Sequence, residues 1–202
     1  MVNWLQKGDN GITPLHTAFA DFVSMPTLVL TARNMLVRDN DDITPLHWAA
    51  YKGHLDKLPC ALLVESNMLV TDCTGDTPLH WAAMGGHLDQ VPAELLTIKN
   101  MQLQNNDGRT PLHSAAKFWQ LVGIPVSLLT EETLFIKNCN GNTPVHIAAL
   151  HGCLDQVPLG LEFPEELREV LGKELWEKNR VILKGRSRLD TPLTEDVGVD
   201  LF

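Results

Sequence analysis

One tetrad recurs along the chain at an almost fixed spacing. Thr-Pro-Leu-His begins at Thr13, Thr44, Thr77 and Thr110, and Thr-Pro-Val-His begins at Thr143. The steps between successive tetrads are 31, 33, 33 and 33 residues. A period between about 20 and 50 residues is typical of proteins built from stacked structural repeats, in which each unit contacts only its neighbours. The sequence therefore predicts a repeat solenoid instead of one globular core.

The segment 72–104 is the clearest repeat unit. Gly75 follows a turn signal and can adopt a positive φ. Thr77 can cap a helix with its hydroxyl, and Pro78 suits the first helical position, where its missing N–H would have had no partner. A glycine at Gly86 is a typical helix stop. We therefore expect a helix of roughly two turns that begins at Pro78.

The second half of each unit follows its own pattern. We expect a short second helix near His87, with Leu88 and Val91 facing inward. Further on, prolines share one phase of the repeat, and a proline there interrupts a long helix but begins a new turn well. We predict a proline-initiated turn that buries paired apolar residues, followed by a turn capped by threonine. The prolines are Pro26, Pro59, Pro92, Pro125 and Pro158, and the threonines are Thr31, Thr97 and Thr130.

The first half of each unit resembles the ankyrin repeat, in which a turn precedes the pattern G-x-TPLH-x-AA-x-x-GH. TPLHWAAYKGHLD at 44–56 and TPLHWAAMGGHLD at 77–89 carry this resemblance, which covers about residues 8–160. The proline-interrupted second half marks an unusual subtype. The resemblance implies a mostly α solenoid with a row of turns beside a concave groove. It implies about five stacked helix-turn-helix repeats in a domain at 1–162, near 8–38, 39–71, 72–104, 105–137 and 138–162.

The tetrad histidines have two readings. The resemblance implies that each one hydrogen-bonds to the backbone and to the nearby threonine, which joins one repeat to the next. Metal ligation is the alternative, but consecutive histidines would lie about one repeat apart, far beyond a coordination distance near 2 Å. We therefore expect structural histidines and no metal or cofactor. They are His16, His47, His80, His113 and His146.

Charge and composition limit the classes of partner. The chain has a formal net charge of -9, and residues 1–163 contain 9 Lys and Arg against 16 Asp and Glu. These acidic repeats lack the basic footprint of a nucleic-acid-binding protein, so we expect a protein partner and no nucleic acid. No run of about 18 apolar residues and no signal peptide is present. The four cysteines form no CxxC pair. We expect a cytoplasmic monomer with free thiols and no membrane association.

Both ends of the chain depart from the repeat pattern. Residues 2–11 resemble the tail of a repeat whose front is absent, which indicates either a truncated cap or part of a longer array. Helical spacing of apolar residues after Pro164 predicts a helix at 163–179 that caps the last repeat. The same segment faintly resembles the start of an F-box, which would imply a ubiquitin-ligase adaptor. The tail at 180–202 could be a relic repeat, a folded-back strand or a separate motif.

Residues that differ between repeats are candidates for recognition. The resemblance places partner contacts at the turn tips and at the exposed end of the first helix, and we expect Trp48 and Trp81 to pack in the core or groove wall. Trp119 replaces the glycine found at Gly86, so we expect an altered backbone there and either a surface hot spot or a space-filling side chain. The predicted partner-binding residues are Ile43, Tyr51, Lys52, Asp76, Met84, Arg109, Lys117, Phe118, Trp119, Asn142 and His151.

The motifs favour binding over catalysis. The chain contains no phosphate loop, nucleophile elbow or HExxH motif, so we expect no enzyme activity. The leading hypothesis is a non-catalytic scaffold that binds a partner through the groove and turn tips. An alternative is an effector or inhibitor that masks a basic target surface. Binding that weakens steeply with salt would favour this alternative.

Overall fold

The structure is a computed structural model that describes residues 3–21 and 26–158. The described residues form α-helices and 3-10 helices without any β-strand among them, which agrees with the expected α solenoid. The predicted helix at 163–179, its F-box-like start and the tail at 180–202 lie outside the described residues.

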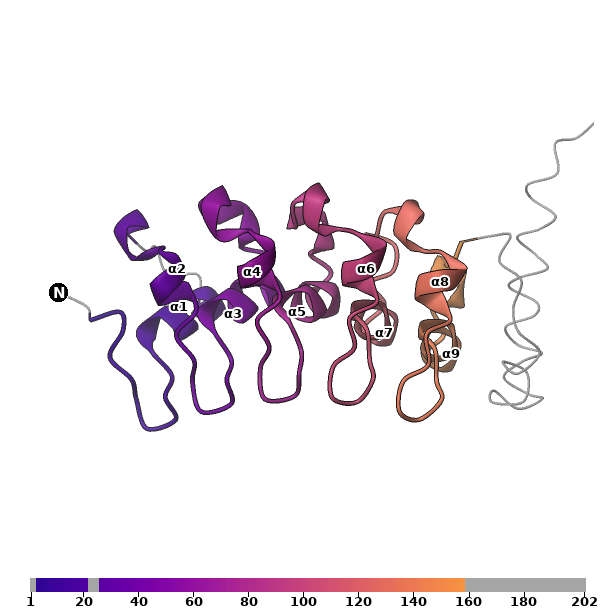
Figure 1. Ribbon diagram of the computed structural model, residues 1–202, viewed down its shortest axis with the longest axis horizontal. Coiled ribbons are helices and arrows are strands. Elements are labelled where there is room, and N and C mark those ends of the chain that lie inside the picture. The colour runs from indigo at the N-terminus through magenta and orange to yellow at the C-terminus, as the bar shows by residue number, and fades with distance from the viewer. Residues whose placement is uncertain (1–2, 22–25, 159–202) are drawn as a thin grey trace, which may run out of the picture.

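The first helix of every repeat begins at the tetrad proline, as predicted. Neighbouring first helices pack side by side and form one continuous row through the molecule (Figure 1). Their tetrad Leu or Val is buried, and so is the residue pair that follows, which is Ala-Ala in four of the helices and Ala18-Phe19 in the first. The small alanines let adjacent helices approach closely. These helices are α1 (Pro14–Asp21), α3 (Pro45–Tyr51), α5 (Pro78–Gly85), α7 (Pro111–Lys117) and α9 (Pro144–His151).

The threonine cap and the glycine stop both appear as expected. In α5, the backbone N–H of Thr77 donates to Nδ1 of His80 over 3.2 Å, and the two side chains close a capping box. This satisfies donors that the first turn of a helix leaves free. Gly86 then ends the helix with a φ of 80°, which is the left-handed conformation that glycine adopts without steric cost.

The second half of a repeat contains up to three short helical turns in place of one long helix, and all three are present in the second and third repeats. The first is a 3-10 helix whose leading leucine is buried, as in η2 (Leu55–Lys57), η4 (Leu88–Gln90) and η7 (Leu154–Gln156). The second starts directly after the recurring proline: η1 (Thr27–Val29), η3 (Cys60–Leu62), η5 (Ala93–Leu95) and η6 (Val126–Leu128). The third comprises α2 (Ala32–Met35), α4 (Glu65–Met68), α6 (Ile98–Met101) and α8 (Glu131–Leu134).

The prediction of a proline-initiated turn followed by a threonine-capped turn is confirmed. Thr31 and Thr97 accept a hydrogen bond from the backbone of the third residue of α2 and α6, and Thr130 caps α8 through a capping box. The burial of the paired apolar residues is less uniform than expected. Leu128 and Leu129 are both buried, whereas Leu95 and Leu96 are only half-buried.

The turns between repeats project as a row of loops along one edge of the molecule, opposite the short turns of the second halves (Figure 1). We call these loops fingers. Neighbouring fingers are joined by backbone hydrogen bonds, for example from Cys73 N to Asp41 O over 2.9 Å and from Asn106 N to Thr74 O over 3.0 Å. The row is therefore a connected surface and not a set of independent loops. The fingers are residues 8–12, 39–43, 72–76, 105–109 and 138–142.

The fourth repeat corrects one expectation. The sequence predicts an altered backbone at Trp119, where the second, third and fifth repeats have glycine, but its φ of 65° keeps the left-handed conformation of Gly86. The departure comes immediately afterwards, because residues 121–123 form a turn without the 3-10 helix seen at η2, η4 and η7. The indole does not fill that region, since 54% of Trp119 is exposed. Leu121 and Ile124 are buried there instead.

Candidate partner-binding surface

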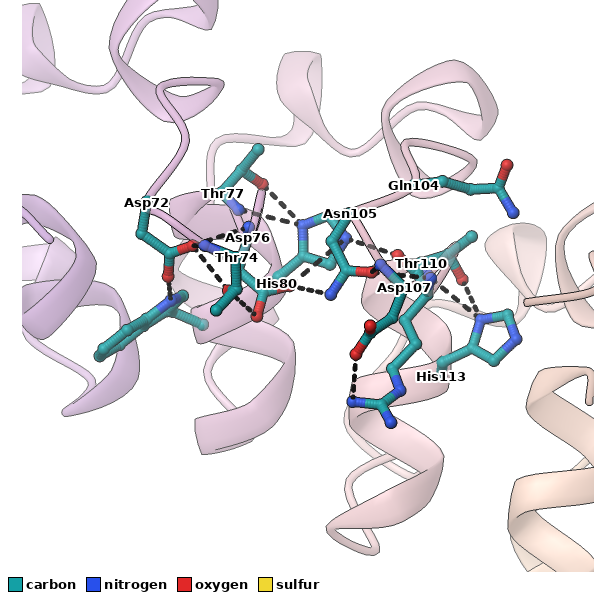
Figure 2. A network of polar contacts seen from close by, with 12 residues as sticks. Asp72, Thr74, Asp76, Thr77, His80, Gln104, Asn105, Asp107, Thr110 and His113 are labelled. Atoms are coloured by element: carbon teal, nitrogen blue, oxygen red, sulfur yellow. Dashed lines mark hydrogen bonds and ion pairs between the residues drawn. The ribbon is translucent and has the colours of Figure 1, made fainter. Parts of the chain in front are cut away.

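His16, His47, His80 and His113 each make hydrogen bonds through both ring nitrogens. Nδ1 accepts from the threonine N–H of its own repeat, so Nε2 carries the ring proton and donates to a carbonyl oxygen of the next repeat. Figure 2 shows this arrangement around His80. The expected structural role is thereby confirmed for four histidines. The Nε2 to oxygen distances are 3.1 Å for His16 to Ile43, 3.1 Å for His47 to Asp76, 3.0 Å for His80 to Arg109 and 2.9 Å for His113 to Asn142.

The acceptor of this bond lies at a position predicted to bind the partner. Ile43, Asp76, Arg109 and Asn142 immediately precede the tetrad threonine, and each supplies only its main-chain carbonyl to the bond. Every residue type has that carbonyl. The fold therefore fixes the backbone of this position and leaves its side chain free to differ between repeats, which explains how four different side chains occupy equivalent places.

A second recurring contact, which was not predicted from the sequence, stabilises the turn of each finger from the second onward. Oδ1 of Asp72 accepts from the backbone N–H groups of Thr74 and Asp76, each over 2.9 Å. Such side-chain bonds to the following backbone stabilise a tight turn. The detectable signal is an Asp or Asn five residues before each tetrad threonine from the second tetrad onward. These residues are Asp39, Asp72, Asn105 and Asn138.

Polar side chains connect the third and fourth fingers to each other and to the helices (Figure 2). Oδ2 of Asp72 accepts from Nε1 of Trp81 over 3.0 Å, which fixes the indole against the finger. Asn105 donates to Oδ1 of Asp76 over 2.7 Å and so bridges adjacent fingers. Arg109 pairs with Asp107 over 3.2 Å within its own exposed finger. The carboxylates of this region therefore already have partners within the chain.

Three aromatic rings pack on the exposed side of α3 and α5. The centroids of Trp48 and Trp81 are 5.4 Å apart, and the ring of Tyr51 lies 6.3 Å from the first and 6.0 Å from the second. Their planes meet at 72–85°, so edges pack against faces, the favoured geometry for aromatic pairs. The tryptophans are half-buried against the core, which agrees with the first of the two expected positions, and they line neither of the hollows described below.

Two hollows lie beside the fingers and helix ends, and they gather most of the predicted residues. A groove of about 230 Å³ lies over α7 and α9 and is lined by more of the predicted residues. A second hollow of about 360 Å³ lies along the helix ends and is lined by fewer of them. Ile43 and Trp119 line neither hollow. Of the predicted residues, the groove contains Asp76, Met84, Arg109, Lys117, Phe118, Asn142 and His151, and the second hollow contains Tyr51, Lys52, Met84 and Phe118.

A family comparison agrees with this architecture. The model described as Ankyrin repeats (3 copies) matches residues 26–92, 58–124 and 93–159, which together cover well over half of the chain. The chain belongs to the ankyrin-repeat family. Ankyrin repeats are protein–protein interaction modules and are typically non-catalytic. A comparison with curated proteins gives no match.

Charge changes along the row of ankyrin fingers. The finger at 39–43 contains three aspartates and the finger at 72–76 contains two. The finger at 105–109 contains one acid and one base, Asp107 and Arg109, and the finger at 138–142 contains only uncharged residues. Among these four fingers, acidic residues are therefore concentrated on the two earlier ones, and the groove over α7 and α9 is lined by Asp76 of the finger at 72–76 together with residues of the two fingers that carry no net charge.

Burial favours the neutral form of His47 and His113 in this ankyrin stack at physiological pH. Burial lowers the pKa of His47 to about 4, and burial also lowers the pKa of His113 to about 4. Their ring nitrogens are already used in hydrogen bonds, so they offer no free base. Within 3–21 and 26–158, no group of His, Cys, Asp or Glu side chains is placed to hold a metal ion. Over the same ranges, no helix has the length and apolarity needed to cross a membrane.

Proposed function

We propose that the chain is a non-catalytic scaffold that holds a partner protein along the concave surface between the fingers and the ends of α3, α5, α7 and α9. The observation that carries this proposal is the groove of about 230 Å³, which brings seven of the eleven predicted binding residues together. Those residues come from three successive repeats. A partner that fills the groove would therefore contact side chains that no single repeat supplies.

The chemistry of this surface suits protein recognition. Phe118 is 40% exposed, and the Nζ atom of Lys117 lies 5.3 Å from the centroid of its ring. Met84 lies between the groove and the second hollow and lines both. Exposed aromatic side chains beside polar groups are typical of the residues that dominate binding energy at protein interfaces. The apolar centre and polar surroundings support a specific contact.

An affinity capture experiment tests the proposal. The bait is the wild-type chain beside a variant with Tyr51→Ala, Phe118→Ala and Trp119→Ala, and lysate of the source cell supplies candidate partners. We expect a protein that the wild type enriches and the variant does not. The matched control carries Leu28→Ala and Val126→Ala, which remove exposed apolar side chains from η1 and η6, away from the fingers. If the control variant loses the enriched protein to the same extent, the partner does not bind specifically at the concave surface.

The acidic fingers favour a second candidate, in which the chain masks a basic surface of its target. Asp41 and Asp42 are exposed at the finger of 39–43, and their charges would attract a basic partner. Affinity that falls steeply between low and high salt supports this mode, whereas salt-insensitive binding contradicts it.

The ligase-adaptor hypothesis depends on residues 164–202, and deletion of that segment tests it by asking whether adaptor recruitment is lost while target binding remains.

A further inference from the structure

The groove over α7 exists where a recurring indole is replaced by a small side chain. The fourth residue after the tetrad threonine is Trp48 in α3 and Trp81 in α5, but Ser114 in α7 and Ile147 in α9. Both indoles are half-buried and pack on each other. The groove of about 230 Å³ is lined by Ser114 and Ile147 and by neither tryptophan. A serine side chain thus leaves space that an indole takes in α3 and α5.

Two cations and one acid line the groove. Asp76 is the single acid in its lining, and its carboxylate accepts from Asn105 over 2.7 Å and from Thr74 Oγ1 over 3.2 Å. Arg109 and Lys117 are the lining cations. Lys117 pairs with no carboxylate in the described part of the chain, and the ion pair of Arg109 with Asp107 is solvent-exposed and therefore weak.

Carboxamide groups complete the polar part of the lining. Asn140 and Asn142 contribute side chains from the last finger, and their backbone N–H groups are already used by Oδ1 of Asn138. Carboxamides both donate and accept, so they can bond to the backbone or a polar side chain of a partner. On the other side, Met84 and Phe118 form an apolar margin. The groove therefore offers cations and amide donors next to an apolar surface.

We propose that the groove over Ser114 receives an acidic side chain, Asp or Glu, from an extended segment of the partner protein. Arg109 and Lys117 meet the carboxylate, and an adjacent apolar side chain of the segment packs on Met84 and Phe118. Charge complementarity selects the acidic side chain, because the cations lack a strong internal partner. This inference rests on the proposed protein-binding function and specifies one chemical group of the partner.

The proposed contact also sets the direction in which the partner segment lies along the row of fingers. The acidic finger at 39–43, which does not line the groove, would repel a second carboxylate, while the neutral finger at 138–142 would not. The acidic residue of the segment therefore lies over α7 and α9, and any basic residue lies toward α3. A groove of uniform charge would not impose this orientation.

Selection from a displayed library of random short peptides tests the inference and does not require the partner to be identified first. The wild-type chain is compared with Ser114→Trp, which places in α7 the side chain that α3 and α5 already accept. A second variant, Lys117→Glu, reverses a charge on an exposed side chain and leaves the core intact. Lys99→Glu is the matched control, because Lys99 is exposed on α6 and lies outside the groove. Thermal unfolding verifies that each variant is folded.

We expect the wild type to enrich peptides that contain Asp or Glu beside an apolar residue. Ser114→Trp and Lys117→Glu should each weaken binding of those peptides by about tenfold or more, while Lys99→Glu leaves it unchanged. Enriched peptides without an acidic preference, binding unaffected by a folded Ser114→Trp, or the enrichment of no peptide would overturn the inference.

The result also separates this inference from the proposed function. Peptides could bind Ser114→Trp normally but lose affinity for the variant with Tyr51→Ala, Phe118→Ala and Trp119→Ala. That result would support binding at the concave surface and contradict the proposed contact of an acidic side chain in the groove. Peptides whose affinity is unchanged in every one of these variants would reject both.

Discussion

Nε2 of His80 lies 3.0 Å from the carbonyl oxygen of Arg109 in the next repeat, while Nδ1 of the same ring lies 3.2 Å from the backbone nitrogen of Thr77 in its own repeat. One side chain therefore caps a helix and holds the following finger in place. Since the side chain of Arg109 also lines the groove, the histidine positions a recognition residue through its backbone.

Replacing this histidine should destabilise the stack. His80→Ala leaves the buried N–H of Thr77 without its acceptor, removes one of the two hydrogen bonds to the carbonyl oxygen of Arg109 and opens a cavity. We therefore expect the free energy of unfolding to fall by about 3 kcal/mol. Denaturant unfolding followed by circular dichroism measures the change. His151→Ala is the control, because that side chain is exposed at the end of α9, and it should change stability by less than about 0.5 kcal/mol. Similar losses in the two variants would contradict the bridging role.

Stability should fall when the pH drops below neutrality. Burial lowers the pKa of His47 and of His113 to about 4, so the unfolded chain, with a histidine pKa near 6.5, binds more protons than the folded chain between these values. The contribution is fully present above pH 6.5 and is lost as the pH falls toward 4, by up to about 3 kcal/mol for each histidine. A proton on Nδ1 would also remove the acceptor of the threonine N–H.

Two measurements check this pH dependence. Urea unfolding at a series of pH values gives the free energy of unfolding directly, and NMR titration of the imidazole protons identifies the groups involved. We expect the resonances of His47 and His113 to titrate well below the ordinary histidine range. If either ring titrates near pH 6.5 in the folded chain, that histidine does not cause the loss of stability at low pH.

The bond between Asp72 and Trp81 can be tested with a double-mutant cycle. Asp72→Asn keeps the Oδ1 acceptor of the finger but places an amide N–H₂ against the indole N–H, so we expect a loss of about 1–2 kcal/mol. The backbone should tolerate the change, because Asn105 fills the same role in the next finger. In a Trp81→Phe background the same substitution should cost much less. Equal costs in both backgrounds would show that the bond does not contribute.

Trp119 allows a test of how much a left-handed backbone conformation lowers the stability of this chain. Its φ of 65° is unfavourable for a residue with a Cβ atom, by about 1 kcal/mol, whereas glycine adopts this conformation freely. We expect Trp119→Gly to be more stable than Trp119→Ala by about 1 kcal/mol, because both remove the indole and only the alanine retains the unfavourable conformation. Thermal unfolding of the two variants measures the difference. If their stabilities are equal, the left-handed conformation is not a cost in this chain.

The sequence predicted those parts of the fold that depend on contacts within a few residues. The cap of α5 joins Thr77 to His80, and the stop at Gly86 needs only its own φ. The proline-initiated turns and the caps at Thr31 and Thr97 depend in the same way on neighbouring positions. These features could be identified in one repeat and verified in the others by their common phase.

The binding surface was predicted only as a set of variable positions. The phase of the repeat indicated Arg109, Lys117 and Asn142, but it did not indicate that they line one groove while Ile43 and Trp119 lie outside it. The anchoring role of Asp72 and its equivalents was also missed, although the recurrence of Asp or Asn five residues before the tetrad was present in the sequence.

The repeat period, the helix caps and the proline-initiated turns were thus determined by the sequence alone, because each arises from hydrogen bonds and dihedral preferences between residues close in the chain. The tertiary structure decided where the concave surface is hollow and which side chains meet there. The groove over Ser114 forms between residues of three repeats, and its shape depends on the volumes and charges of side chains about 33 residues apart. Such distances are set by packing between repeats, for which local sequence patterns carry no direct signal.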